Sequence, residues 1–267
     1  MKKIFIHTLF VSLAFVALAL TACGGAPPAG YTGGSQATPI IQPETNSGQG
    51  SDTGGGADMS IAKDILLDPA NAADADSLFV LGYLYEGLVK LENDALAPAL
   101  AESWSVSDDG LDYIFHLRPN LAFHDGTPVN ADAVIANFNR WFDKDDPAHG
   151  DGAYAAWASI FGGFKGETGD AGQPKSVFDG AEKVDDYTVL IHLAQPDAKF
   201  VAKLVNPAFS IASPAAFGAE GFGTSTGKAA GTGPYKLSAW DDTGLTLEPF
   251  AAYWNGAQTD TLVFPFK

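Results

Sequence analysis

Five histidines and several paired acids are the residues of this sequence whose types could support metal binding or acid–base chemistry. His116 and His124 flank one predicted hairpin, so their rings could approach each other, and Asp125 follows His124 directly. A metal site needs three or four converging ligands with supporting hydrogen bonds. No nucleophile pattern accompanies His124 and Asp125. We therefore expect one partly buried histidine and one turn histidine, with no metal, no cofactor and no catalytic residue.

The paired acids all fall in predicted turns, where aspartate side chains hydrogen-bond to nearby backbone amides. These pairs are Asp108–Asp109, Asp145–Asp146, Asp185–Asp186 and Asp241–Asp242. The sequence contains no nucleophile elbow, zinc-binding helix or dinucleotide fingerprint, and Gly166 after Lys165 excludes a phosphate loop. An enzyme therefore has no positive support, and a secreted hydrolase would require turnover that depends on His124 or Asp125.

Four aromatic residues lie in segments predicted to be irregular, where stacking on a ligand is easier than within a strand. They are Tyr154, Trp157, Phe209 and Trp254. Ordinary core packing is the alternative for each of them.

Charge and cysteine content limit the possible partners and the means of stabilisation. The formal charge is −17, and removal of Lys2 and Lys3 with the first 22 residues would take it to −19. Such an acidic chain repels nucleic acid and gains nothing from an anionic membrane surface. Cys23 is the single cysteine, so no internal disulfide is possible and packing must stabilise the core.

The N-terminal part of the sequence predicts secretion and a lipid anchor. Residues 1–22 combine Lys2 and Lys3 with a long apolar run, and Leu-Thr-Ala then precedes Cys23. This pattern resembles the bacterial lipoprotein signal, in which the cysteine is lipidated, and a plain signal peptide or an uncleaved span is the alternative. Residues 23–58 are rich in Gly, Pro and Ser, which predicts a flexible tether.

From residue 59 the sequence predicts a folded body that contains both strands and helices. We expect a strand over 60–67 and a loop over 70–76. A helix should carry Leu78, Leu81 and Leu84 at helical spacing and close at Gly87 in a left-handed conformation. A strand over 88–91 and a turn or short helix over 98–104 follow.

Residues 99–130 hold the most diagnostic run of local signals. Tyr113, Phe115 and Leu117 alternate on one face of a strand, a short apolar run follows at 121–123, and Asn130 opens a helix over 131–142. Further along, we expect helical turns near 154–161, a strand over 187–193, a helix over 198–205 and an extended run over 207–213. A turn at 231–234 then leads to strands over 235–240, 245–248 and 262–264.

Taken in order, several motifs of the sequence form a set that covers nearly the whole chain from residue 60. They are Leu67-Asp68-Pro69, Tyr85-Glu86-Gly87-Leu88, Pro98 to Trp104, Phe115-His116-Leu117-Arg118, Phe123 to Pro128, Val184 to Leu193, Gly231 to Tyr235 and Tyr253-Trp254. This set resembles the extracellular solute-binding proteins of family 5, the peptide and nickel receptors of ABC importers.

The resemblance implies a type II periplasmic-binding-protein-like fold with two α/β lobes that close on a ligand. It also implies the permease subunits of an ABC importer as partners, which would recognise the closed state. Residues 59–267 would form lobe one, with an extra subdomain over about 90–200. The chain stops about where family members cross to lobe two, so we expect that lobe to be absent, as in a truncated receptor.

The resemblance also implies three ligand-facing places. They are Asn71, Ala72, Ala73 and Asp74; then Tyr154 with Trp157; then Asn206 to Phe209. The ligand stays open among peptides, nickel chelates, haem and sugars, and a non-binding remnant or structural surface lipoprotein is the alternative function. We expect the protein to lie outside the cytoplasm, held to the membrane through lipidated Cys23.

Overall fold

Groups of strands and mostly short helices follow one another along the residues that the computed structural model describes, 59–256 and 258–267. The helices are α1 (Ala75–Leu84), α2 (Ala131–Phe142), α3 (Ala155–Phe161), α4 (Phe200–Lys203) and α5 (Pro214–Phe217), with the 3₁₀ helix η1 (Pro207–Phe209). The strands are β1 (Val89–Glu92), β2 (Ala95–Pro98), β3 (Ala101–Val106), β4 (Asp112–Leu117), β5 (Phe178–Asp185), β6 (Thr188–Leu193), β7 (Tyr235–Trp240), β8 (Gly244–Pro249) and β9 (Leu262–Pro265). The predicted signal peptide (1–22), Cys23 and the predicted tether (23–58) lie outside the described residues.

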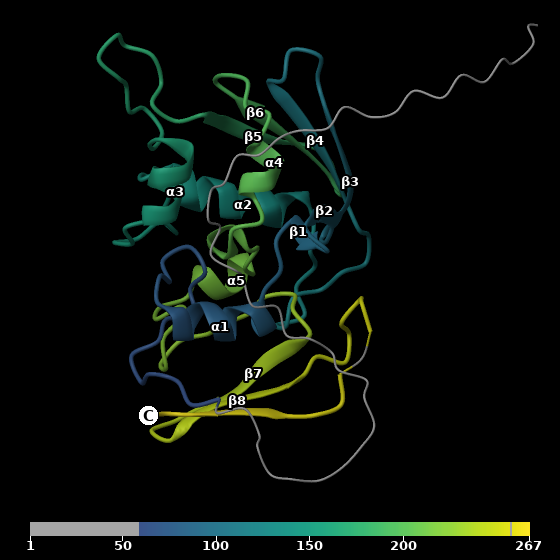
Figure 1. The fold of residues 1–267 in the computed structure, drawn as a ribbon, viewed down its shortest axis with the longest axis vertical. Helices are drawn as coiled ribbons and strands as arrows, with labels where there is room; N and C mark the ends of the chain where they lie inside the picture. Colours follow the sequence, from purple (N-terminus) through teal and green to yellow (C-terminus); the bar gives the residue numbers. More distant parts are fainter. Residues whose placement is uncertain (1–58, 257) are drawn as a thin grey trace, which may run out of the picture. The chain divides into compact units, whose positions relative to one another are not determined.

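An antiparallel sheet in the order β3-β4-β6-β5 occupies the middle of the chain (Figure 1). Tyr113, Phe115 and Leu117 of β4 alternate on its buried face, because successive side chains of a strand point to opposite faces. Val189 and Ile191 of β6 pair with Phe115 and Tyr113 and extend the same face. Both predicted alternating strands are therefore confirmed, and α2 packs against this sheet at β5.

Helix α2 begins at the cap that the sequence predicts. The side-chain oxygen of Asn130 accepts a hydrogen bond from the Ala133 amide at 2.9 Å, which satisfies one of the amides left unpaired in a first helical turn. Phe138 and Trp141 are buried on one side of the helix, and the Phe138 ring stacks on Phe178 of β5 at 5.3 Å. Each such buried side chain contributes about 2 kcal/mol, so this stripe holds α2 on the sheet.

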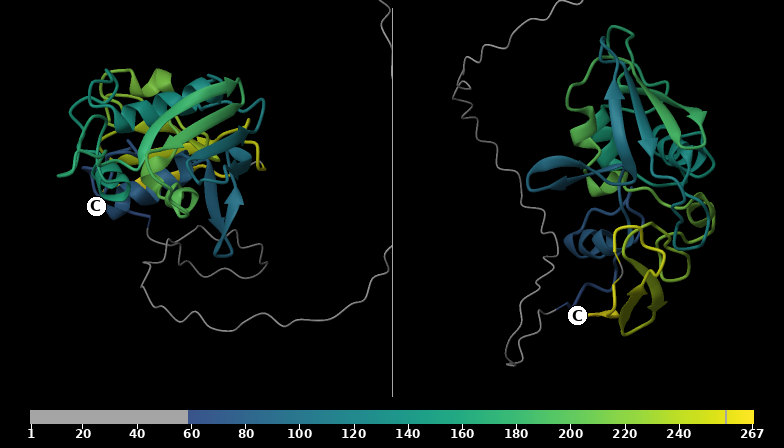
Figure 2. Two further views of the ribbon diagram at one scale, coloured as in Figure 1. Left: turned by 90° about the horizontal axis from the view of Figure 1, so that it is seen from above. Right: turned by 90° about the vertical axis from the view of Figure 1, so that its right-hand side faces the viewer.

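A second antiparallel sheet, in the order β7-β8-β9, lies beside α1 (Figures 1 and 2). The rings of Phe79 and Tyr83 on α1 meet Phe264 of β9 edge to face, at centroid distances of 5.9 and 5.7 Å. Tyr83 makes the same kind of contact with Tyr235 of β7 at 5.8 Å. These edge-to-face contacts between aromatic rings fix α1 against the sheet.

The predicted turn at 231–234 passes directly against the end of α1. The amide of Gly233 donates to the carbonyl of Leu84 at 3.0 Å. A Cβ atom on Gly231 would lie 2.2 Å from that carbonyl oxygen, and one on Gly233 would lie 2.4 Å from the backbone carbonyl oxygen of Tyr83. Both positions therefore require glycine because of the close approach of the two backbones.

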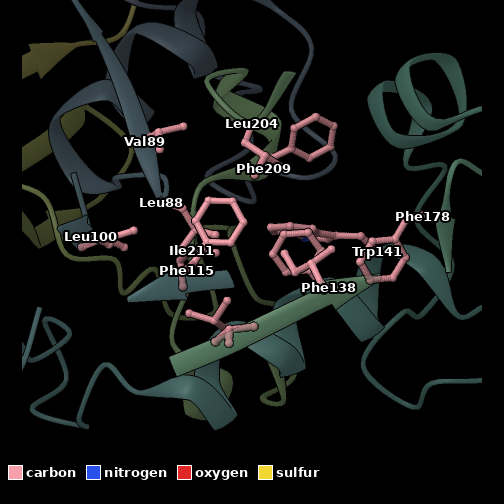
Figure 3. Close-up of a cluster of buried hydrophobic side chains, with 14 of the residues drawn as sticks. Leu88, Val89, Leu100, Phe115, Phe138, Trp141, Phe178, Leu204, Phe209 and Ile211 are labelled. Atoms are coloured by element: carbon pink, nitrogen blue, oxygen red, sulfur yellow. The ribbon is translucent and has the colours of Figure 1, made fainter. Parts of the chain in front are cut away.

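Within residues 59–256 and 258–267, buried apolar side chains form two clusters. The first draws on residues 70–211, and Figure 3 shows part of it, where Phe138, Trp141 and Phe178 approach one another. The second draws on residues 61–85 and 212–264. The expected extra subdomain, about 90–200, falls within the first cluster, and its boundaries stay a prediction.

Residues 60–67 do not form the predicted strand. Ile61 alone makes a β-bridge, a single parallel one to Phe266, which follows β9. The amides of Ala62 and Leu66 donate instead to the side chains of Asp76 at 2.7 Å and Ser77 at 2.8 Å. An amide bound to a side chain of α1 is not available to a sheet ladder. This prediction is therefore wrong except at Ile61.

The predicted turn or short helix at 98–104 is also wrong, since this segment holds the end of β2 and the first part of β3. Ala101 pairs with Leu117 and Trp104 pairs with Phe115. A neighbouring strand edge thus outweighs local preference, as is common for strands.

Helix α1 ends earlier than predicted. It closes at Leu84, and Tyr85 is already extended. Gly87 is not left-handed and instead allows close packing, since a Cβ atom there would lie 3.2 Å from the Val89 carbonyl oxygen.

Candidate ligand-binding site

The first predicted ligand-facing place is a surface loop that leads into α1, here called the 71–74 loop. Asn71 and Ala72 are half-buried, while Ala73 and Asp74 are exposed. Asp74 caps α1 by accepting a hydrogen bond from the Ser77 amide at 2.8 Å. Burial raises the pKa of Asp74, but the hydrogen bonds from Ser77 outweigh it, so the net shift is downward. The loop therefore ends in a fixed negative charge.

A buried ion pair lies beneath the 71–74 loop. Arg140 of α2 donates from Nη1 to Oδ1 of Asp68 at 3.1 Å and from Nη2 to Oδ2 at 2.5 Å, and the two side chains are 5% and 7% exposed. Asp68 also accepts from Nδ2 of Asn71 at 2.8 Å, and Nε of Arg140 donates to the Ala148 carbonyl at 3.0 Å. This two-point geometry fixes direction as well as distance, and the added hydrogen bonds satisfy a pair that is costly to bury.

Tyr154, the second predicted place, is joined to the first. Its amide donates to Oδ1 of Asn71 at 3.1 Å. Its side chain is fully buried, and its hydroxyl donates to the His149 carbonyl at 2.8 Å. Burial raises the pKa of Tyr154 to about 12, with the positive charge of Arg140 opposing the shift. The hydroxyl is therefore protonated at neutral pH and already has an acceptor.

Trp157 and the third predicted place, residues 206–209, meet in the aromatic core. Trp157 and Phe209 are 1% and 2% exposed, and their rings lie 6.0 Å apart, edge to face. Phe209 also contacts Trp141 at 5.6 Å (Figure 3). Asn206 is half-buried and caps η1 through the Ala208 amide at 3.0 Å. Core packing, the alternative left open above, accounts for both rings, and their contact with a ligand stays a prediction.

The two histidines considered for a metal or catalytic pair have separate surroundings. His116 is exposed on β4, with Nδ1 3.4 Å from the Thr188 hydroxyl. His124 is half-buried, with Nε2 3.0 Å from the Gly233 carbonyl, and its Nδ1 accepts from the Gly231 amide at 3.3 Å. Burial lowers the pKa of His124 to about 4, so its ring is neutral at pH 7. Among the described residues, no three His, Cys, Asp or Glu side chains are grouped to hold a metal.

All four acid pairs serve turns, as expected from the sequence. Asp109, Asp146, Asp185 and Asp241 each accept a hydrogen bond from the backbone amide two residues further on. Asp125 makes the same contact and also accepts from the Ser213 hydroxyl at 2.5 Å. These carboxylates stabilise turns.

A second polar cluster joins two motifs that the sequence marks separately. The Tyr253 hydroxyl donates to Oε1 of Glu86 at 3.0 Å, and Nε1 of Trp254 donates to Oε2 of the same carboxylate at 3.0 Å. Burial raises the pKa of Glu86, and these hydrogen bonds oppose the shift. The guanidinium of Arg118 lies over the Trp254 ring at 4.3 Å. No local signal predicts this meeting, because 167 residues separate Glu86 from Tyr253.

One surface hollow is lined by none of the predicted ligand-facing residues. It has a volume of about 490 Å³ and is lined in part by Lys63, Asp64, Trp240, Asp241 and Asp242. Its acidic, open rim gives no indication of a specific ligand.

The family model for bacterial extracellular solute-binding proteins, family 5 (middle part), matches residues 95–266, which is more than half of the chain. The chain belongs to this family. The predicted resemblance is therefore confirmed.

Family 5 relatives with curated names include the glutathione-binding protein GsiB of Escherichia coli strain K12 and that of Shigella boydii. They are 37% and 38% identical over 191 residues, which is 70% of this chain and 33% of each relative. The chain thus spans about a third of the length of the curated relatives it matches.

Solved structures of binding proteins from other bacteria resemble this chain over a similar part. HbpA2 from Haemophilus parasuis aligns with a TM-score of 0.66 and 30% identity, over 78% of this chain and 42% of that one. DppA from Helicobacter pylori, in complex with the peptide STSA, aligns with a TM-score of 0.63 and 30% identity, over 76% and 40%. The fold is that of a type II periplasmic binding protein, as predicted, and this coverage is consistent with one lobe.

The family model and the curated relatives cited above are named for the binding of solutes. In the part of the chain that the structure describes, no helix has the length and apolar character of a membrane span.

Proposed function

We propose that this chain is the first lobe of an extracytoplasmic receptor that captures short peptides or a similar small solute for an ABC importer. The family match over residues 95–266 carries the proposal. A relative named for glutathione, which is a tripeptide, and a solved relative that holds the peptide STSA support the ligand class. Because the chain spans about a third of its curated relatives, import through permease subunits is proposed for a receptor that has both lobes.

The 71–74 loop is the proposed ligand-facing surface of this lobe. Ala73 and Asp74 are exposed, and the ion pair beneath the loop restricts its position. Asn206, at the start of η1, is the second proposed contact because it is half-buried at the surface of the same lobe. Ligand would stabilise the closed arrangement of two lobes, and the importer would bind that closed state.

The same proposal places the protein outside the cytoplasm on a lipid anchor. Residues 1–22 would be removed, Cys23 would be lipidated, and residues 23–58 would hold the 59–267 lobe away from the membrane. Several acyl chains, at about 0.8 kcal/mol for each buried CH₂ group, give stable attachment. Fatty-acid labelling in cells tests this: the wild-type chain should carry label, whereas C23S should carry none and leave the membrane fraction. Label on C23S would refute the anchor.

Calorimetric titration of the chain with glutathione and with the peptide STSA tests the binding function. We expect saturable heat for at least one of these probes. A73R places a long charged side chain on the exposed loop and should abolish that heat. A198R makes the same change at an exposed site before α4 and should not affect it. If wild-type protein binds neither probe, the receptor proposal is wrong for this chain, and the alternative of a non-binding surface lipoprotein gains support.

A further inference from the structure

Hydrogen bonds join five residues from separate segments into a closed circuit, here called the polar ring: Asp68, Asn71, Arg140, His149 and Tyr154. Arg140 binds Asp68 at two points, Asp68 accepts from Asn71, and Asn71 accepts from the Tyr154 amide. The Tyr154 hydroxyl donates to the His149 carbonyl at 2.8 Å, and Nδ1 of His149 lies 2.7 Å from the Arg140 carbonyl. Since a carbonyl only accepts, His149 carries its proton on Nδ1 in this contact. The circuit therefore returns to Arg140.

The polar ring is almost entirely shielded from water. Asp68, Arg140 and His149 are 5%, 4% and 7% exposed, and Tyr154 is fully buried. Asn71 is the one member that reaches the surface, and the exposed residues Ala73 and Asp74 follow it. Fully satisfied buried polar networks of this kind hold one geometry, because moving any member leaves a buried polar group unpaired.

The backbone of Tyr154 indicates how firmly this geometry is held. Tyr154 has φ +44° and ψ +44°, the left-handed region that large side chains rarely adopt. The backbone amide of Tyr154 donates to the side chain of Asn71, and the Tyr154 hydroxyl donates to the His149 carbonyl. Gly152 lets the side chain of Asn71 come close to the backbone before Tyr154, since a Cβ atom on residue 152 would lie 2.5 Å from Nδ2 of Asn71. Such strain persists only where surrounding contacts determine the conformation, and it clusters at functional places.

We propose that the polar ring is a positioning device for the 71–74 loop, and that Tyr154 is a positioning residue within it instead of a ligand contact. The fully buried side chain of Tyr154 offers no surface to a ligand, and its hydroxyl is already bound. The ring holds the loop through Asp68, whose carboxylate accepts from the Ala70 amide at 3.2 Å and from Asn71. This inference deepens the proposed function and rests on it for the ligand.

Hydrogen exchange of the amides of residues 70–74, measured by mass spectrometry, tests the positioning role directly. H149A removes the imidazole that bonds Arg140 and stacks on the Tyr154 ring at 4.1 Å. Loss of one hydrogen bond corresponds to roughly a fivefold change in an opening equilibrium, so these amides should exchange at least about fivefold faster. H192A is the matched control, because it removes a histidine bound to Asp112 in the β4–β6 pair, away from the polar ring. It should leave exchange at 70–74 unchanged.

Y154F separates positioning from direct contact. This change keeps the aromatic ring of residue 154 but removes the hydrogen bond to the His149 carbonyl. If Tyr154 is a positioning residue, the amides of residues 70–74 should exchange faster and the Kd for glutathione or STSA should rise. A positioning role also predicts that Y154F and H149A are not additive in the double variant, since both open the same circuit. A higher Kd in Y154F with unchanged loop exchange would show direct contact and overturn the inference.

The inference and the proposed function can fail separately. Unchanged exchange at 70–74 in both H149A and Y154F refutes the polar ring as a positioning device, whether or not a probe binds. Absence of probe binding to wild-type protein refutes the proposed function, while the exchange measurement still decides whether the ring holds the loop. If H149A does not fold, Y154F alone gives the same decision.

Discussion

Acidification should destabilise this protein through His124, well above the pH at which most of its carboxylates titrate. The neutral ring of His124 accepts a hydrogen bond from the Gly231 amide at Nδ1 and contacts the Gly233 carbonyl through Nε2. A proton on Nδ1 would remove the acceptor for Gly231, at the turn packed against the end of α1. H124Q removes the titrating group and keeps a neutral polar side chain of similar length.

The sign and size of the effect follow from the pKa of His124, which burial lowers from 6.5 to about 4. The unfolded chain takes up the proton at higher pH than the folded chain, so stability falls as the pH drops from about 6.5 towards 4. Linkage between proton binding and folding lowers the free energy of unfolding by about 2 kcal/mol between pH 7 and pH 5, and by about 3 kcal/mol between pH 7 and pH 4. Below pH 4 both states are protonated and this contribution stops changing.

Urea unfolding at pH 7, 6 and 5, followed by tryptophan fluorescence, measures this loss. The difference in free energy of unfolding between wild type and H124Q isolates His124, and it should shrink by about 2 kcal/mol from pH 7 to pH 5. H116Q makes the same chemical change at the exposed histidine of β4, which does not contact the turn, and should keep the wild-type profile. A difference that stays constant with pH would refute the link between burial and protonation of His124.

Three further predictions use the same unfolding assay. The raised pKa of Glu86 means that the folded chain takes up this proton at higher pH than the unfolded chain, which favours folding as the pH falls. E86Q removes this contribution, so the free energy of unfolding should fall more steeply on acidification than in wild type. An unchanged slope would contradict this. G231A should lower the free energy of unfolding by about 3 kcal/mol through its clash with the end of α1, whereas G82A, with no atom near the added methyl group, should raise it by about 0.5–1 kcal/mol. N137A should cost about 3 kcal/mol, because Asn137 satisfies both the amide and the carbonyl of Ala212 at 3.0 and 2.8 Å, and a cost below 1 kcal/mol would show that water replaces these bonds.

Elements with strong local signals could be predicted from the sequence. The alternation of Tyr113, Phe115 and Leu117 requires only that one face of β4 be buried, and this is the case. Asn130 requires only the first turn of α2 to act as its cap. In both cases the residues that decide the structure are within a few positions of one another.

Elements decided by distant partners could not be predicted in the same way. Strand β5 buries only Phe178 among its eight residues, so it shows no alternation, and it is a strand because β6 pairs with it. Residues 60–67 show the reverse case, since side chains of α1 bind two of their amides and prevent a ladder. The missed strand and the false strand have the same physical cause, which is competition for backbone hydrogen bonds by groups far along the chain.

The same competition decides which way the side chain of Tyr154 faces. Tyr154 lies at a loop end in the sequence, but its direction depends on Asn71, 83 residues earlier, and the ion pair beneath spans 72 residues. Once Asn71 holds the amide of Tyr154 and His149 holds its hydroxyl, the ring can face only the interior. Sequence motifs could therefore name the loops of the proposed site, whereas the proposed choice between contacting and positioning residues follows from burial and from the bonds each polar atom already makes.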